Sequence, residues 1–266
     1  MHELDTKRIV IKIGSNVLTR DDGTMDITRM SSIVDQVAWL WKKGVEVIMV
    51  TSGAVACGKS ILKHEDRLDK VEQRQLFSAI GQVMLMSHYT YFFWDYSIYV
   101  GQVLTMKENF TSGEEYDNLQ RCMNAMLENG VIPIMNENDT VCITELMFTD
   151  NDELSGLTAK MMKADTLLIL SDIDGLYDGD PEESGTTLIR HIDPFEDLSR
   201  YISSKKSSAG RGGMESKCKT AEEVARCGIK VIIANGKREN VISRLFSEPG
   251  NVPHTEFTAG EPVLNP

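Results

Sequence analysis

RIVIKIGS, residues 8–15, is a short run rich in β-branched residues that stops at a glycine. Such a run predicts a buried strand, with Gly14 in the turn that ends it. The apolar residues beyond it recur at helical spacing: Met30, Ile33, Val34, Val37, Leu40 and Trp41. Gly44 is placed where a C′ glycine would end that helix, and the apolar run 45–50 follows directly. The first fifty residues therefore predict a strand, a helix and a second strand.

The same alternation continues along the chain. We expect further helices at about 72–93, 114–129, 153–163 and 221–227, and further strands at 98–104, 131–135, 166–170 and 230–234. Strands that alternate with helices predict an α/β fold with a mostly parallel sheet covered by helices on both faces. From Pro249 the chain is punctuated by proline and glycine. We therefore expect one compact domain over residues 1–250 and a surface tail over residues 251–266.

Composition and charge exclude several classes of protein. The 266-residue chain has a formal net charge of -12, which repels polyanions and argues against a nucleic-acid partner. Its apolar runs are too short to span a membrane, and its polar N-terminus does not resemble a signal peptide. The five cysteines are scattered and include no C-x-x-C pair. These features predict a cytoplasmic protein with reduced thiols that handles any phosphate through locally placed lysines and backbone amides.

Polar and glycine-rich residues gather where the predicted strands end. These segments are 12–15, 51–54, 136–139, 150–152 and 171–175, with a further glycine-rich loop at 209–217. Ligands bind at the carboxyl ends of parallel strands, glycine lets backbone amides approach an anion, and lysine adds a charge. Each segment also has a purely structural interpretation, as a tight turn, a Lys12 that reaches solvent, or an Asx turn. Their coincidence at strand ends favours a phosphate-handling site.

One segment fits a different class of nucleotide-binding protein. GAVACGKS, residues 53–60, matches the P-loop pattern, and the apolar run 167–172 ends in an acidic residue as in P-loop enzymes. A P-loop NTPase is therefore an alternative. Against it, the pattern follows the second predicted strand and leaves Lys12 and the loop 209–217 unexplained. The residues Ala54–Cys57 also read as a helix already under way.

Together, six motifs give the chain a resemblance to a known family. They are RIVIKIGS (8–15), VTSGAV (50–55), PIMNEND (133–139), TDND (149–152), SDIDGLY (171–177) and GGMESK (212–217). In this order, over residues 7 to 247, they resemble the amino-acid kinase family. NEND and GGMxxK resemble in particular the members that phosphorylate the γ-carboxylate of glutamate with ATP, the first step of proline biosynthesis. Many such members append a PUA module, which is not expected in this chain.

The resemblance implies a three-layer α/β/α sandwich and assigns a role to each motif. Ser52, Gly53, Asp139 and Asn151 would bind glutamate. Lys12 and Lys217 would hold the phosphoryl group during transfer, and Asp150 would orient both lysines. The remaining positions would bind ATP: Ser171, Asp172, Arg211, Gly212, Gly213, Met214, Glu215 and Ser216, together with Lys12 and Lys217.

Cofactors and partners also follow from the resemblance. ATP and Mg²⁺ are the implied cofactors, L-glutamate the substrate, proline a feedback inhibitor, and a glutamyl phosphate reductase the downstream partner. A homo-oligomer is implied as well. Independently of the resemblance, the composition of the aromatic cluster 89–94 favours a place in the core or at a subunit interface over a ligand site. Two positions depart from the family pattern. Asn16 replaces a serine or threonine, and Arg211 replaces a threonine, which puts nucleotide affinity in question.

The chemistry fits this assignment and leaves two further alternatives. A carboxylate is already an anionic nucleophile, so the reaction needs relief from charge repulsion, which two lysines and Mg²⁺ supply. A sister enzyme acting on acetylglutamate, aspartate or carbamate is one alternative, against which the segment 136–139 argues. A non-catalytic sensor of glutamate, proline or nucleotide is the other. The presence of Lys12, Asp150 and Lys217 together argues against it.

Overall fold

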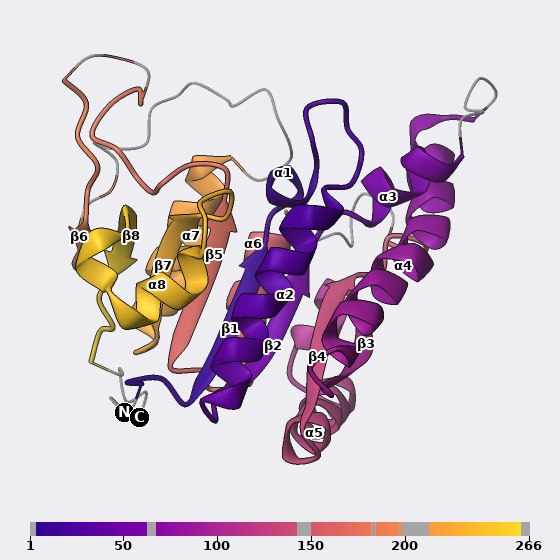
Figure 1. Ribbon diagram of the computed structural model, residues 1–266. Helices are drawn as coiled ribbons and strands as arrows, with labels where there is room; N and C mark the ends of the chain where they lie inside the picture. The colour runs from indigo at the N-terminus through magenta and orange to yellow at the C-terminus, as the bar shows by residue number, and fades with distance from the viewer. Residues whose placement is uncertain are drawn as a thin grey trace.

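Eight strands form one sheet within the residues that the computed structural model describes, which are 4–62, 68–142, 150–181, 183, 185–196, 198 and 213–261 (Figure 1). The strands are β1 (Arg8–Ile13), β2 (Glu46–Thr51), β3 (Tyr99–Thr105), β4 (Val131–Glu137), β5 (Thr166–Ser171), β6 (His191–Ile192), β7 (Lys230–Asn235) and β8 (His254–Phe257). Their order across the sheet is β3-β4-β2-β1-β5-β7-β8-β6, so β1 lies near the middle. Every pairing is parallel except β7 with β8. The predicted mostly parallel sheet is confirmed.

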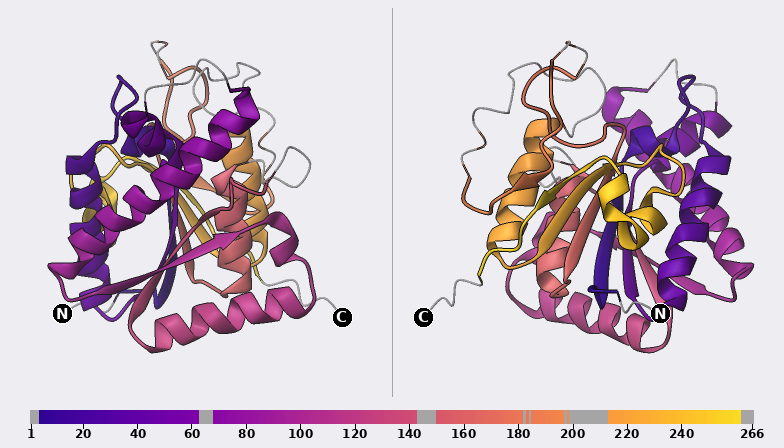
Figure 2. Two further views of the ribbon diagram at one scale, coloured as in Figure 1. Left: turned by 90° about the vertical axis from the view of Figure 1, so that its right-hand side faces the viewer. Right: turned by 60° about the vertical axis from the view of Figure 1, so that its left-hand side comes forward.

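Helices cover both faces of this sheet. They are α1 (Ser15–Leu18), α2 (Ile27–Lys42), α3 (Ala54–Ile61), α4 (Lys70–Trp94), α5 (Glu114–Glu128), α6 (Asn151–Met161), α7 (Met214–Arg226) and α8 (Val241–Ser247), with short 3₁₀ turns at Lys107–Phe110 and Pro249–Asn251. Helices α2 and α8 pack on one face, while α6 and α7 pack on the other (Figures 1 and 2). The result is the three-layer α/β/α sandwich that the resemblance implied.

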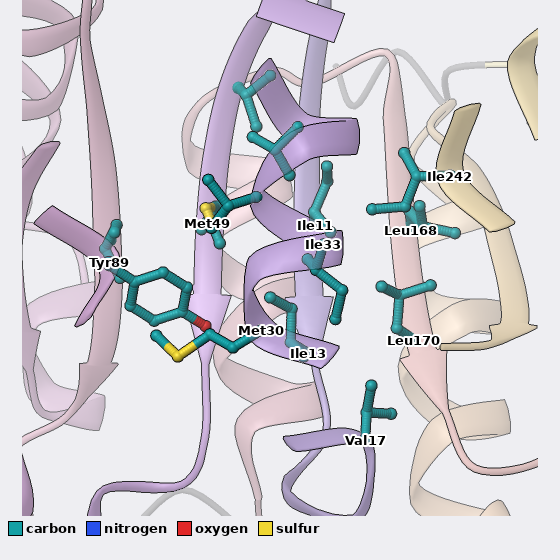
Figure 3. Close-up of a cluster of buried hydrophobic side chains, with 14 of the residues drawn as sticks. Ile11, Ile13, Val17, Met30, Ile33, Met49, Tyr89, Leu168, Leu170 and Ile242 are labelled. Atoms are coloured by element: carbon teal, nitrogen blue, oxygen red, sulfur yellow. The ribbon is translucent and has the colours of Figure 1, made fainter. Parts of the chain in front are cut away.

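Strand β1 shows how the sequence pattern divides between the two layers. Successive side chains of a strand point to opposite faces of the sheet. Ile9, Ile11 and Ile13 accordingly join the core under α2 and α8, part of which is drawn in Figure 3. Val10 packs in the core under α6 and α7. Lys12 has the same parity as Val10, so the alternation directs this lysine to the α6–α7 face.

The helix ends follow local capping chemistry. Asp26 caps α2 by accepting a hydrogen bond from the backbone N–H of Arg29. Gly44, expected to stop this helix, has a φ of 84° just beyond it. At α4, Asp69 and Glu72 form a reciprocal capping box. Asp150 caps α6 through the backbone N–H groups of the next turn. No helix in the described part of the chain is both long and apolar enough to cross a membrane.

The expected surface tail over 251–266 is wrong for its described part. His254–Phe257 forms β8, which pairs antiparallel with β7, and Thr255 and Phe257 are fully buried. The Thr255 hydroxyl accepts a hydrogen bond from Leu176 N and donates one to Ile189 O. The strand is only four residues long and follows a Pro/Gly-rich turn, so its pattern was too short to indicate a strand. Residues 262–266 lie outside the described part of the chain.

Two glycines allow α3 and α4 to touch backbone to backbone. A Cβ atom on Gly81 would lie 1.8 Å from the carbonyl oxygen of Ala54, and one on Gly58 would lie 2.0 Å from that of Phe77. Gly58 belongs to the segment that matches the P-loop pattern. That segment is helical from Ala54 onward, and its second glycine serves helix packing. The structure therefore does not support a P-loop at 53–60.

We expect Gly81→Ala to destabilise the protein by about 1–3 kcal/mol, because the new methyl group must push α3 away. Alanine normally stabilises a helix interior relative to glycine by roughly 0.5–1 kcal/mol, so the sign of the effect is diagnostic. The measurement is the free energy of unfolding from denaturant titration. Gly250→Ala, where an added Cβ meets no described atom within 4 Å, is the control. Equal stability of Gly81→Ala and the wild type would contradict the close helix contact.

Candidate functional site

A cleft of about 920 Å³ runs along the carboxyl ends of the strands. It is lined by the residues that follow β1, β2, β4 and β5, by the first residues of α3, α6 and α7, and by part of α4. Lys12, Ser52, Gly53, Asp139, Asp150, Asn151, Ser171, Asp172, Met214 and Lys217 all line it. The structure therefore brings together most of the predicted site residues. Arg211 and Gly212 lie outside the described residues.

Two buried lysines share one carboxylate at the centre of the cleft. The Nζ atom of Lys12 lies 2.5 Å from Oδ1 of Asp152, and Nζ of Lys217 lies 2.8 Å from Oδ2. The relative exposures are 4% for Lys12, 7% for Lys217 and 0% for Asp152. The three side chains come from β1, α7 and the first turn of α6, all on one face of the sheet. Two ammonium groups against one carboxylate leave this trio with an excess positive charge.

Burial and pairing act in opposite directions on the pKa values of Lys12 and Asp152. Burial lowers the pKa of Lys12, and the Asp152 carboxylate raises it only part of the way back. Burial opposes ionisation of Asp152, but the two lysines outweigh it and hold the pKa of Asp152 below its usual value. Pairing between Lys12 and Asp152 thus offsets part of the free-energy cost of burying their charges.

Asp150 has a different position from the one expected. Its Oδ1 accepts hydrogen bonds from the backbone N–H groups of Asp152, at 2.8 Å, and Glu153, at 3.0 Å. The carboxylate that contacts both lysines belongs to Asp152, while the charge of Asp150 still raises the pKa of Lys12, so the orienting role of Asp150 stays a prediction. Helix phase separates the two acids, because Oδ1 of Asp150 caps α6 while Asp152 faces the two lysines. Asp150 Oδ2 is buried and has no hydrogen-bond partner among the described residues.

A chain of amides joins the ends of β2 and β4 beside the lysines. Asn151 Nδ2 lies within 3.0 Å of the Thr51 carbonyl, Ser52 Oγ and Asn136 Oδ1. Asn136 Nδ2 in turn donates to Gln82 Oε1 on α4, also at 3.0 Å. These bonds fix the orientation of Asn151, the residue after the α6 cap, and hold Ser52 and Asn151 together. Gly53 follows as the N-cap of α3.

Acidic residues and one arginine meet at the far side of this chain of amides. Arg74 of α4 contacts Glu137 at 2.9 Å and also pairs with Asp139. Glu137, which follows Asn136, is the last residue of β4, and Asp139 lies two residues beyond it. Glu137 is buried, and its side chain and that of Asp139 are 7% and 10% exposed. Asp139, predicted to contact substrate, therefore already carries a charged partner within the protein.

Ser171 ends β5 and Asp172 follows it, on the opposite side of the lysines. Burial opposes ionisation of Asp172, but hydrogen bonds from Asn16 at 2.9 Å and Ser171 at 3.2 Å hold its pKa below the usual value. Asn16, which departs from the family pattern, thus has a defined partner. Gly213 is the N-cap of α7, and Met214, Glu215 and Ser216 form its first turn before Lys217.

The sequence indicated the positions of the site residues better than the side chains with which they pair. Asn136 and Asp152 lie inside motifs that were recognised, but no role was assigned to either. Arg74 and Gln82 were not identified, because they belong to a long helix whose pattern gives no sign of which polar residues face the cleft. Their spacing of eight residues, close to two helical turns, places them on one side of α4 and is the only signal the sequence holds.

Comparison with known proteins agrees with this geometry. Residues 7–235 match the family model described as the amino acid kinase family. Proteins named glutamate 5-kinase are similar to this chain. The one from Bacteroides thetaiotaomicron is 56% identical, covering 94% of this chain and 69% of the relative. The one from Chlorobaculum tepidum is 44% identical (96% and 70%), and the one from Clostridium acetobutylicum is 36% identical (91% and 92%).

Solved structures share the fold at low sequence identity. UMP kinase from Ureaplasma parvum has a TM-score of 0.66 and 16% identity, covering 96% of this chain and 100% of that one. An isopentenyl phosphate kinase has a TM-score of 0.64 and 16% identity, covering 94% and 100%. At such identities the likeness concerns the fold alone. The family model and the relatives together show that this chain belongs to the amino acid kinase family.

Proposed function

We propose that this protein transfers the γ-phosphoryl group of ATP to the γ-carboxylate of L-glutamate, which yields L-glutamyl 5-phosphate and opens proline biosynthesis. The observation that carries the proposal is the buried trio of Lys12, Asp152 and Lys217 at the centre of a cleft. The trio has an excess positive charge, and phosphoryl transfer to a carboxylate requires positive charge between two anions. The names of the relatives at 56% and 44% identity support glutamate as the acceptor.

The reaction needs charge stabilisation and alignment but no proton transfer. An oxygen of the γ-carboxylate forms a bond to the γ-phosphorus while the bond from that phosphorus to the bridging oxygen of ADP breaks. Both reactants are anions, so the attack is opposed by their repulsion. The ammonium groups of Lys12 and Lys217 stabilise the negative charge on the group in transfer, and Asp152 keeps both at fixed positions.

Nucleotide and magnesium would lie on the β5 side of the trio. Ser171, Asp172 and the start of α7 line that side, together with Met214 and Lys217. Mg²⁺ is usually held by one or two carboxylates plus the phosphates of its nucleotide. Oδ2 of Asp150, which is buried and has no hydrogen-bond partner in the described part of the chain, would be a fitting protein ligand in this cleft. When bound, the ion would neutralise phosphate charge.

The remaining proposals concern the setting of the reaction. All five cysteines are free thiols within the described residues, and we propose that the enzyme works in the reducing cytoplasm. An acyl phosphate is labile, so a glutamyl phosphate reductase is the proposed recipient of the product. Proline is the proposed feedback inhibitor, and millimolar proline should raise the glutamate concentration needed for half-saturation. A homo-oligomer is the proposed assembly.

The function is tested by trapping the product with hydroxylamine in the presence of ATP and Mg²⁺, using glutamate, N-acetylglutamate and aspartate. Hydroxamate formation with glutamate alone would support the proposal. Formation with another acid would keep the chemistry and change the substrate. Folded protein that binds ATP but gives no hydroxamate with any acid would favour a sensor.

Lys217→Ala should lower kcat by about 10²–10³-fold or more, because one of the two charges that stabilise the transferring group is lost. Lys59→Ala should largely spare turnover, since Lys59 lies on α3 with its ammonium 5.8 Å from the centre of the Phe77 ring. Steady-state kinetics of both variants provides the measurement. If Lys59→Ala were inactive while Lys217→Ala remained active, the result would favour the P-loop interpretation instead.

Asp152→Asn should lower kcat by about 10²-fold or more and also change its pH dependence. Asp152 raises the pKa of Lys12 while burial lowers it, so loss of the carboxylate charge lowers this pKa further. The decline of kcat at alkaline pH should therefore begin at a lower pH than in the wild type. The substrate's own ammonium group titrates identically in assays of the wild type and the variant, so it cannot account for a difference between them. An alkaline limb that does not move would contradict an electrostatic role for Asp152.

A further inference from the structure

Arg74 forms a mixed-charge cluster at the β4 side of the cleft. Its guanidinium pairs with Glu137 and Asp139, and all three residues line the cleft. The arginine side chain is 23% exposed, so it is largely enclosed but still reaches the cleft. Each of the two carboxylates lies within hydrogen-bond distance of the guanidinium, so the cluster offers both a cation and anions to a ligand.

The cluster lies at a fitting distance from the phosphoryl-transfer centre. In the sheet, β4 is separated from β1 by β2 alone. Adjacent strands are about 4.8 Å apart, so the end of β4 lies roughly 10 Å from the end of β1. The amides of Asn151 and Asn136 bridge this interval from Asp152 to Glu137. A glutamate whose γ-carboxylate lies at Lys12 and Lys217 would extend its other end toward Arg74.

That other end carries both charges on one carbon. The α-ammonium needs acceptors, which the carboxylates of Glu137 and Asp139 supply. The α-carboxylate needs a donor, and a guanidinium offers five N–H groups in a planar fork suited to carboxylates. Lys59 and Lys70 also line the cleft, but both are exposed, whereas Arg74 is largely enclosed beside the two acids.

We propose that Arg74 determines specificity for an α-amino acid, by donating hydrogen bonds to the α-carboxylate while it holds Asp139 and Glu137 for the α-ammonium. This inference rests on the proposed function, since it concerns the acceptor of the same reaction. It assigns recognition of the α-carboxylate to a residue of helix α4, and none of the strand-end motifs includes a residue of that helix.

The test compares glutamate with 4-aminobutyrate, which keeps the amine and the carboxylate to be phosphorylated but lacks the α-carboxylate. A hydrogen bond to a charged group contributes about 1.5–3 kcal/mol, which corresponds to a preference of about 10- to 100-fold. We expect the wild-type kcat/KM to favour glutamate by at least this factor. In Arg74→Gln, the ratio of the two kcat/KM values should fall toward one.

Two further variants make the ratio decisive. Lys70→Gln removes the same charge from the same helix and cleft without touching the acid pair, and should keep the wild-type ratio. Arg74→Lys keeps the charge but loses the planar fork, and should give an intermediate ratio. Using a ratio also separates recognition from folding, because a loss of structure lowers turnover of both substrates together.

Four outcomes would overturn the inference. The first two are a wild type that does not distinguish the two substrates and an Arg74→Gln variant that keeps the wild-type ratio. The other two are a parallel loss of both activities in Arg74→Gln while Arg74→Lys keeps the ratio, and a ratio that falls equally in Lys70→Gln. Failure of the proposed function is a separate result, namely wild-type protein that phosphorylates another acid or none, and it would remove this inference as well.

Discussion

The site depends on one carboxylate that holds two buried ammonium groups. Taking a charge out of water is costly unless it is paired, and Asp152 is fully buried between Lys12 and Lys217. The trio can form only if β1, α6 and α7 pack on the same face of the sheet in the correct phase. Its excess positive charge is compensated when an anionic group binds. Under the proposed function, the contacts that stabilise the folded protein would therefore also set its affinity for a phosphoryl group.

Most of the fold was predictable because its signals are periodic and local. The alternation in β1 and the helical spacing in α2 each extend over several residues, and capping residues such as Gly44 mark the ends. Strand β8 was missed because four residues beside a Pro/Gly-rich turn carry almost no periodicity. Its strand character comes from pairing with β7 and from the hydrogen bonds of Thr255, which are long-range contacts.

The position of the site could be predicted from the sequence, but the pairing of its charged side chains could not. Strand ends converge at one edge of a parallel sheet, so Lys12, Ser52 and Asp172 could be placed together from the sequence. Which acid contacts the lysines depends on the phase of α6. Oδ1 of Asp150 accepts hydrogen bonds from backbone N–H groups of its own helix, and Asp152, two residues later, contacts Lys12. A shift of two residues along a helix start changes a capping residue into a buried ion partner.

Sheet order also explains why α4 belongs to the site although it carries no recognised motif. The trio lies at the end of β1, and the chain of amides spans the ends of β2 and β4. The carboxylate of Asp172, which accepts hydrogen bonds from Asn16 and Ser171, lies at the end of β5. The two reactants of the proposed reaction would therefore approach the trio from opposite sides. The β4 side has few neighbours within the sheet, since only β3 lies beyond it. Helix α4 closes that side with Arg74 on the acids, Gln82 on Asn136, and Tyr89, whose hydroxyl lies 2.8 Å from that of Thr51. These contacts are spaced along one helix at seven- to eight-residue intervals, about two turns each, so a single rigid element contacts the ends of both β4 and β2.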